Sequence, residues 1–211
     1  MRSIVKEVSF TRKLSWAWPE TDERLLQAFD TVDDIEYIMT FVDAHRVCVQ
    51  AGGACGVWPY RLSQLFAVVY TFEPEEENLA CLMENTWGIE NIKVSDLALW
   101  DTSNKGVMQK TESNNAGTGY FKPGAGDIST TTIDDLGLAF CDLIQLDIEG
   151  GELQALKGGK GTIETYRPVI VIEEKSLPQT GRDYKLPRQY LESIGYKLVG
   201  MIHNDRVFKW S

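Results

Sequence analysis

The sequence predicts an α/β fold, with a mostly parallel sheet, helices on both of its faces and a closing antiparallel hairpin. Three observations indicate this class. From residue 47 onward, short apolar runs of strand length alternate with segments of helical periodicity. A glycine-rich turn at 52–56 follows the first of these runs. Near the C-terminus, two strand-like runs flank Asn204-Asp205, which is a signal for a hairpin turn.

Each predicted element rests on a local signal. The run 47–51 is apolar apart from Gln50, which is typical of a strand buried on both faces. Pro59 suits the first turn of a helix, and the acidic residues 75–77 suit the positive end of the next one. The expected elements are strand 47–51, helix 59–66, strand 68–73, helix 75–86, strand 92–99, a short strand at 130–133, a helical turn at 133–138, strand 143–148, helix 152–166, strand 169–173, helix 187–194 with Gly195 as its C-cap, and strands 196–202 and 206–210.

The segment 101–131 interrupts this alternation. It is rich in Gly, Ser, Thr and Asn, so the sequence predicts a long loop there. A loop of this length inside a compact domain is usually functional or mobile. We expect residues 114–119 to form a lid or a substrate clamp, and a solvated flexible loop is the alternative.

Residues 1–46 are expected to form an N-terminal helical extension packed on the core, and residues 47–211 a cofactor-binding domain. The first helix is expected to enter at 19–22, and Thr31 with Asp34 resembles a capping pair for the second. Their apolar faces are formed by Leu25, Leu26 and Phe29 and by Ile35, Ile38, Met39 and Val42. We expect this extension to cover an edge of the sheet rather than to cap the substrate side.

Composition limits the partners. The chain has 211 residues, and its 31 acidic and 21 basic residues give a net charge of −10. No dense Lys/Arg cluster occurs, which argues against a nucleic-acid acceptor. No apolar run reaches the length of a membrane span, and the N-terminus lacks the apolar centre of a signal peptide, so we expect no membrane partner and a cytoplasmic protein. The four cysteines form no C-x-x-C pair and are expected to be buried, reduced thiols.

The glycine-rich turn points to a nucleoside-containing cofactor. Glycines at 52, 53 and 56 let the backbone turn sharply and approach a ligand, next to a helix start that offers free N–H groups. Glu73 ends the next strand about 20 residues on, where a carboxylate accepts hydrogen bonds from ribose hydroxyls. A nicotinamide-type G-x-G-x-x-G fits poorly, because Ala51 stands at its first glycine position.

Four segments carry more specific motifs: VQAGGACG at 49–56, FEP at 72–74 with Asn78, LALWD at 97–101, and DLIQLDIEGGE at 142–152. Together they resemble the FkbM family of S-adenosylmethionine-dependent methyltransferases, and the likeness extends over about residues 48–210. The resemblance implies the Rossmann-like class I methyltransferase fold. In that fold a seven-stranded sheet has the order 3-2-1-4-5-7-6, with the last strand reversed.

The first motif departs from the family pattern. Family members commonly carry Asp where this chain has Gln50, and Ala-Asn where it has Gly53-Ala54. Gln50 can form hydrogen bonds but brings no charge to a cofactor ammonium group. The Val-Gln-Ala-Gly-Gly variant resembles members from bacteriophage genomes, which suggests a viral origin.

The resemblance implies a set of site residues. Cofactor-binding residues are expected at Gln50, Ala51, Gly52, Gly53, Gly56, Glu73, Pro74, Asp96 and Asp147. The Gly52–Gly56 turn would approach the amino acid end and the ribose. Asp96 would accept from the adenine amino group, or would cap a turn. Asp147 would hold the cofactor ammonium or act as a base.

Candidates for the catalytic base are Asp147, Glu149, Glu173, Glu174 and His203. Because side chains alternate along a strand, we expect only one of Asp147 and Glu149 to face the pocket, and Glu149 alternatively caps the next helix. His203 has a suitable pKa for a base but is alternatively a plain exposed turn residue. Strand-end carboxylates suit a divalent metal, yet their spacing here is not diagnostic, and we predict no metal.

The resemblance implies transfer of a methyl group from S-adenosyl-L-methionine, leaving S-adenosyl-L-homocysteine, to a hydroxyl of a sugar, glycan or small metabolite. Two other functions remain open on the sequence. One is an NAD(P)-dependent oxidoreductase, and the other is a noncatalytic cofactor-binding module of the same fold.

Overall fold

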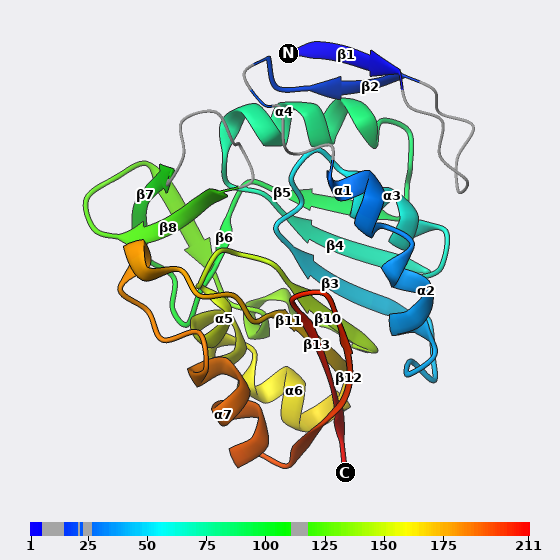
Figure 1. Ribbon diagram of the computed structural model, residues 1–211, viewed down its shortest axis with the longest axis vertical. Coiled ribbons are helices and arrows are strands. Elements are labelled where there is room, and N and C mark those ends of the chain that lie inside the picture. Colours follow the sequence, from blue (N-terminus) through cyan, green and yellow to red (C-terminus); the bar gives the residue numbers. More distant parts are fainter. Residues whose placement is uncertain (6–14, 21, 23–26, 111–117) are drawn as a thin grey trace.

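The computed structural model describes residues 1–5, 15–20, 22, 27–110 and 118–211. Its centre is a seven-stranded sheet in the order β5-β4-β3-β10-β11-β13-β12 (Figure 1). The strands are β3 (Val47–Ala51), β4 (Val68–Phe72), β5 (Ile92–Ser95), β10 (Leu143–Leu146), β11 (Val169–Glu173), β12 (Tyr196–Ile202) and β13 (Asp205–Trp210). The five strands from β5 to β11 run parallel, and β13 pairs antiparallel with β11 and β12. The predicted fold class and strand order are confirmed.

The order of the strands decides where a ligand can bind. The chain passes from β3 outward to β4 and β5 on one side, and from β10 outward to β11 on the other. The sheet therefore reverses its winding between β3 and β10. In open α/β sheets, the carboxyl ends of the strands at such a reversal leave a crevice for ligands.

Helices cover both faces of the sheet (Figure 1). The helices that follow β3 along the chain are α3 (Val57–Ser63), α4 (Glu76–Asn85), α5 (Glu152–Gly158), α6 (Lys160–Tyr166) and α7 (Leu186–Ser193). Cys48 packs in the cluster that contains Leu62 of α3, whereas the neighbouring Val49 packs in the cluster that contains Leu156 of α5. Adjacent strand residues point to opposite faces, so one apolar run supplies both layers of the core.

The first 46 residues contain strands as well as helices. β1 (Arg2–Val5) pairs antiparallel with β2 (Ser15–Trp18), and the short helices α1 (Gln27–Thr31) and α2 (Asp34–Met39) follow. Trp16 and Trp18 are fully buried with period two, a strand pattern that the helical expectation overlooked. Of the expected helix entry at 19–22, residues 19, 20 and 22 are described and are not helical, whereas residue 21 and residues 23–26, including Leu25 and Leu26, lie outside the described residues; α1 is described from Gln27.

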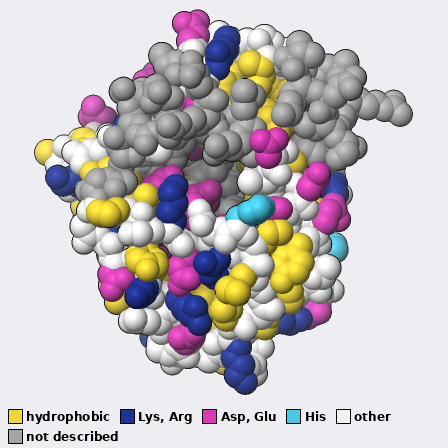
Figure 2. Space-filling model, viewed as in Figure 1, with side chains coloured by type: hydrophobic (Ala, Val, Ile, Leu, Met, Phe, Trp, Pro, Cys, Tyr) yellow, Lys and Arg dark blue, Asp and Glu magenta, His cyan; other side chains and the backbone are white. Residues whose placement is uncertain are grey.

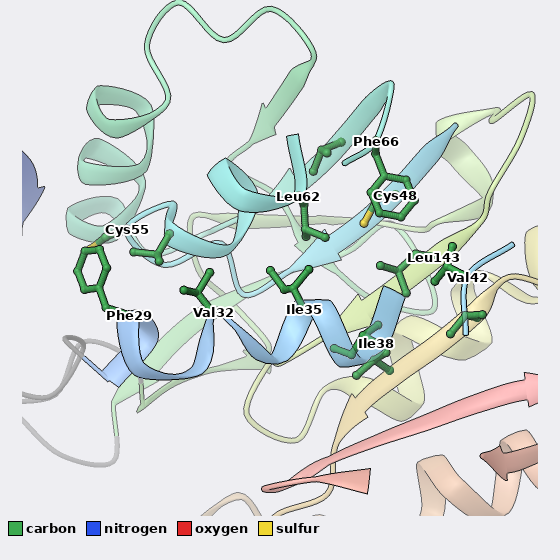
Figure 3. Close-up of a cluster of buried hydrophobic side chains, with 14 of the residues drawn as sticks. Phe29, Val32, Ile35, Ile38, Val42, Cys48, Cys55, Leu62, Phe66 and Leu143 are labelled. Atoms are coloured by element: carbon green, nitrogen blue, oxygen red, sulfur yellow. The ribbon is translucent and has the colours of Figure 1, made fainter. Parts of the chain in front are cut away.

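The proposed Thr31–Asp34 cap is also corrected. Asp33 is the N-cap of α2 and makes no side-chain capping bond, while Thr31 ends α1. Figure 3 shows Phe29 beside Cys55 and Ile35 directed toward Leu62, within one cluster that also contains Val32, Ile38, Cys48 and Leu143. Side chains on both sides of residue 46 thus share one cluster, and a domain division at that residue remains a prediction.

The segment expected to be a long loop contains most of a second sheet. β6 (Ala98–Leu99), β7 (Lys105–Lys110), β8 (Gly119–Pro123) and β9 (Ile128–Thr131) form four strands in the order β6-β9-β7-β8. The glycines that suggested a loop are partly packing residues: a Cβ on Gly106 would lie 2.3 Å from the carbonyl oxygen of Lys122. The predicted strand 92–99 correspondingly divides into β5 and β6, which belong to different sheets.

The remaining differences are smaller. The predicted helix 152–166 divides at Gly159 into α5 and α6. Here the chain passes close to other backbone, since a Cβ on Gly158 would lie 2.0 Å from the carbonyl oxygen of Trp100. The expected helical turn is a single 3₁₀ turn at Asp134–Leu136. Within the described ranges, every helix is too short or too polar to cross a bilayer.

Candidate functional site

A cleft of about 360 Å³ opens at the carboxyl ends of β3, β4, β10 and β11. It lies at the reversal of strand order that the topology predicts as a binding crevice. Figure 2 shows a hollow in this face of the molecule, with acidic, basic and histidine side chains around it. The cleft is lined by most of the site residues predicted from the sequence: Gln50, Ala51, Gly52, Gly53, Glu73, Pro74, Asp147, Glu149, Glu173 and His203.

The glycine turn is held tightly against the neighbouring strands. The N–H groups of Gly52 and Gly53 both donate to the carbonyl oxygen of Phe72, at 3.1 and 3.0 Å. The Asp147 N–H donates to the carbonyl oxygen of Ala51 at 3.1 Å. Gly52 has φ of 86°, and a Cβ there would lie 1.9 Å from the carbonyl oxygen of Asp147. Both the backbone angle and the lack of space require glycine at this position.

Gln50 lines the cleft but uses its polar atoms to stabilise the turn. Its side chain is buried, its Nε2 donates to the carbonyl oxygen of Gly52 at 2.9 Å, and its Oε1 accepts from the Thr71 hydroxyl at 2.5 Å. Gly56 is not among the residues that line the cleft. It is the N-cap of α3 with φ of 87°, and its N–H donates to the carbonyl oxygen of Gly53. Gln50 and Gly56 thus stabilise the turn through hydrogen bonds within the protein.

Glu73 follows β4 and is almost completely buried. Its Oε2 accepts from the N–H of Ala54 at 2.8 Å, and its Oε1 accepts from the N–H of Glu75 at 2.9 Å. Burial raises the pKa of Glu73 to about 7, against the lowering effect of these two hydrogen bonds. Each carboxylate oxygen has a second lone pair, so Glu73 can still accept from hydroxyl groups in the cleft.

On the other side of the cleft, three carboxylates converge. One oxygen each from Asp147, Glu149 and Glu173 lies within 4.8 Å of the other two. β10 ends at Leu146, and Glu149 has φ of 51° in a turn that follows. The expectation that only one of Asp147 and Glu149 faces the pocket was wrong, because both line the cleft. Residues two apart on a strand share a face, so alternation would not separate them, and both residues in any case follow the end of β10.

The carboxylates of this cluster are short of positive charge. Burial, followed by repulsion from Asp147, raises the pKa of Glu149 to about 7 and that of Glu173 to about 9. Asp147 is exposed as a residue, but desolvation within the cleft raises the pKa of its carboxyl, although Lys175 and a hydrogen bond with Glu173 oppose this. The Nζ of Lys175 lies 3.5 Å from Glu149 Oε1 and 3.7 Å from Glu173 Oε1. Among the described residues, one ammonium group thus faces three acids.

Glu149 was alternatively expected to cap the next helix, but Glu152 forms the hydrogen bonds at that helix start. The Oε1 of Glu152 accepts from the N–H groups of Ile148 and Gly150, at 3.1 and 3.2 Å, immediately before its own helix. This bond pair holds the turn that carries Glu149. The sequence indicated the turn through Gly150-Gly151 but gave no sign of which acid would stabilise it.

His203 and Asp96 lie apart from the carboxylate cluster. His203 is exposed in the β12–β13 turn, with its Nε2 3.4 Å from Asp34 Oδ2 at the rim of the cleft. Asp96 is exposed in the link between β5 and β6 and is not among the residues that line the cleft. Of the predicted lid, residues 114–117 lie outside the described part of the chain, whereas Thr118 and Gly119 line the cleft.

The sequence reasoning missed several residues of the cleft. Lys175 was overlooked although it directly follows the predicted candidates at 173 and 174. Asp205 was interpreted only as a turn residue, yet it faces Glu173 across the β11–β13 ladder, and burial together with repulsion from Asp147 raises its pKa to about 8. The four-stranded sheet adds an apolar wall, where the rings of Trp100 and Phe121 meet edge to face at 5.0 Å.

Comparisons with known proteins agree with this geometry. The family model described as the methyltransferase FkbM domain matches residues 51–198. No protein of curated function matches the sequence. The family model therefore spans both sides of the cleft, from the glycine turn through the carboxylate cluster.

Solved structures of methyltransferases share the fold. A methyltransferase FkbM from Methylobacillus flagellatus KT matches with a TM-score of 0.56 and 21% identity, over 79% of this chain and 44% of that one. A precorrin-6y C5,15-methyltransferase from Geobacter metallireducens GS-15 has a TM-score of 0.53 and 14% identity, over 93% and 94% of the two chains. Magnesium protoporphyrin IX methyltransferase from Synechocystis PCC 6803, with bound SAH, has a TM-score of 0.50 and 13% identity, over 90% and 85%. This chain thus spans less than half of the Methylobacillus protein.

Proposed function

Because this chain belongs to the FkbM methyltransferase family, we propose that it transfers the methyl group of S-adenosylmethionine to a hydroxyl of a sugar, glycan or small metabolite. The observation that carries the proposal is the combination of Gly52 and Glu73 in one cleft, each just after the end of one of two adjacent strands. A turn without side chains and a buried carboxylate face one cleft from adjacent strands. That pairing suits an adenosyl group whose ribose hydroxyls donate to Glu73.

The cleft suits the other parts of the cofactor as well. The Gly52–Gly56 turn brings backbone close to the ligand without side chains in between, which suits the amino acid end. The sulfonium and ammonium of the cofactor are positive, and the carboxylate cluster around Asp147 offers the opposite charge. Trp100 and Phe121 give an apolar surface for the adenine ring.

When bound, S-adenosylmethionine supplies a methyl carbon that a positive sulfur has already activated. The protein has to align the acceptor oxygen, exclude water and take up the hydroxyl proton. Asp147, Glu149 and Glu173 are our candidates for that proton. The pKa of Glu149, raised to about 7, suits general-base work near neutral pH, whereas Glu173, with a pKa of about 9, keeps its proton there unless a cation or a neighbouring group lowers that pKa. His203 is a weaker candidate because its imidazole faces Asp34 at the rim.

Calorimetric titration with S-adenosylhomocysteine, compared with NADH and NADPH, tests the choice of cofactor. We expect saturable binding of S-adenosylhomocysteine at one site and none of the dinucleotides. The reverse result would assign the chain to the oxidoreductase alternative. Binding of S-adenosylhomocysteine without methyl transfer to any member of a broad hydroxyl-acceptor panel would favour a noncatalytic module.

A further inference from the structure

We propose that Asp147, Glu149 and Glu173 form a binding site for one hard divalent cation of the Mg²⁺, Mn²⁺ or Ca²⁺ type. One oxygen of each carboxylate lies within 4.8 Å of the other two. Metal–oxygen bonds of about 2.0–2.6 Å place ligand oxygens roughly 3–5 Å apart, so this spacing fits without rearrangement of the backbone. Carboxylate oxygens are the ligands that these cations prefer. The sequence spacing predicted no metal, because the third ligand comes from a different strand.

A second observation points to a missing partner. Glu149 is 7% exposed, and its Oε2 is buried without a hydrogen-bond partner among the described residues. Glu149 lines the cleft and belongs to the three-carboxylate cluster. Buried carboxylate oxygens are ordinarily hydrogen-bonded, paired with a cation or bound to a metal. A cation among the three acids supplies the partner that this oxygen lacks.

The charge around the cluster also calls for a cation. Three carboxylates, with Asp205 beside them, face one ammonium group from Lys175. Lys175 lies 3.5 and 3.7 Å from its two acidic partners, which is longer than the roughly 2.7–2.9 Å of a strong charge-assisted hydrogen bond. A divalent ion carries twice the charge and coordinates all three oxygens at once. We therefore expect the metal to displace Lys175 from the cluster.

The structure offers Lys175 another place. Its side chain is 39% exposed, and it also lines a second cavity of about 260 Å³, which shares Glu173 with the cleft. Glu152 and Asp183 line that cavity too and provide alternative acidic neighbours. A lysine side chain rotates at low cost, so its departure does not require the fold to change.

The metal's catalytic role rests on the proposed function. With three protein ligands, a six- to eight-coordinate ion keeps positions for water or for an acceptor hydroxyl, whose acidity it raises. The acceptor would then be one that presents an oxygen to the metal beside the cofactor. Metal binding itself requires neither cofactor nor acceptor, and it can be measured without them.

The experiment titrates Mn²⁺ into chelator-treated protein with no cofactor present, monitored by electron paramagnetic resonance and calorimetry. We expect one saturable site from which Mg²⁺ or Ca²⁺ competes Mn²⁺. Glu149→Gln and Glu173→Gln should each weaken binding at least tenfold, and Lys175→Gln should tighten it at least threefold. Lys209→Gln is the matched control: Lys209 is similarly exposed and pairs with Asp43 on the surface, so this change alters net charge equally but should leave Mn²⁺ affinity unchanged.

Absence of a saturable site, or binding that survives both glutamine substitutions, would overturn the proposal. Equal tightening by Lys175→Gln and Lys209→Gln would also overturn it, since the effect would then be one of net charge. Circular dichroism of each variant separates loss of the site from loss of the fold. Because S-adenosylhomocysteine binding is measured separately, a failed metal titration leaves the proposed cofactor untouched, and the converse also holds.

Discussion

The two sides of the cleft differ in how their polar groups are satisfied. On the β3–β4 side, both terminal polar atoms of the Gln50 side chain and both carboxylate oxygens of Glu73 form hydrogen bonds with nearby groups of the chain. On the β10–β11 side, Glu149 has an oxygen without a partner among the described residues, and a single lysine faces three acids. The first side is rigid and already shaped, whereas the second is charged and incomplete. This contrast suits a cofactor held by the first side and chemistry performed on the second.

Neutralising the incomplete side should have the largest effect. We expect Asp147→Asn or Glu173→Gln to reduce turnover roughly 10²–10⁴-fold, the usual contribution of a general base. The affinity for S-adenosylhomocysteine should change far less, because Glu73 and the glycine turn remain. Transfer of a labelled methyl group under single-turnover conditions measures the first quantity, and calorimetry measures the second.

Glu192→Gln is a suitable control for these variants, since Glu192 is an exposed acid on α7 that forms an i,i+4 ion pair with Arg188, away from the cleft. Wild-type turnover by both Asp147→Asn and Glu173→Gln would contradict the assignment. The cluster would then be structural, and the contrast between the two sides would lose its functional meaning.

Disturbing the rigid side should instead reduce stability and cofactor binding together. Gly52→Ala would place a Cβ 1.9 Å from the carbonyl oxygen of Asp147, at φ of 86°. Backbone strain alone costs roughly 1–3 kcal/mol, and the overlap adds to it. Urea denaturation should therefore show a lower free energy of unfolding.

Gly88→Ala separates strain from overlap. Gly88 has φ of 78°, and a Cβ there would meet nothing within 4 Å. Its alanine variant should lose only the strain contribution and should retain cofactor affinity. Equal losses of stability in the two variants would show that the close approach between the turn and Asp147 is unimportant.

The smallest expected effect is the pH dependence from Glu73. Its pKa in the folded protein is about 7, above the ordinary value of 4.5 for glutamate. The folded protein therefore keeps a proton that the unfolded chain loses, so stability from this group is full below about pH 4.5 and declines as pH rises to about 7. Cofactor binding should change in the opposite direction. It should improve several-fold from pH 6 to pH 8, because ribose hydroxyls donate better to the carboxylate than to the acid.

Glu73→Gln should remove the affinity trend and should make the stability trend shallower, since Glu149, Glu173 and Asp205 also have raised pKa values and keep their contributions to it. Paired measurements of unfolding free energy and of S-adenosylhomocysteine affinity across this pH range test the prediction. An affinity profile that keeps its slope in the glutamine variant would place the titrating group elsewhere in the cleft.

The central sheet could be predicted because its strands are short apolar runs separated by helical periodicity. The peripheral elements could not. Trp16 and Trp18 alternate as in a strand, but with only four residues in β2 this pattern is too short to stand out from the helices expected around it. The segment from Lys105 to Thr131 needs some of its glycines because backbone approaches backbone there: a Cβ on Gly106 would lie 2.3 Å from the carbonyl oxygen of Lys122, and a Cβ on Gly126 would lie 2.1 Å from that of Gly106. Local composition cannot distinguish such packing from a loop.

The candidate site divides in the same way. The glycine turn and Glu73 are visible in the sequence because their roles depend on local backbone geometry. The carboxylate cluster is not, since its closeness depends on the β10–β11 pairing and on the left-handed conformation at Glu149. Lys175 and Asp205 were missed for the same reason: each becomes part of the cleft only through the position of the strand beside it.

A crystal structure with S-adenosylhomocysteine tests the central claim most directly. We predict that both ribose hydroxyls donate to Glu73, that the amino acid end lies against the Gly52–Gly56 turn, and that the sulfur points toward the carboxylates around Asp147. A ligand bound elsewhere, or a Glu73 carboxylate that contacts only Ala54 and Glu75 while the ribose lies away from it, would contradict the account.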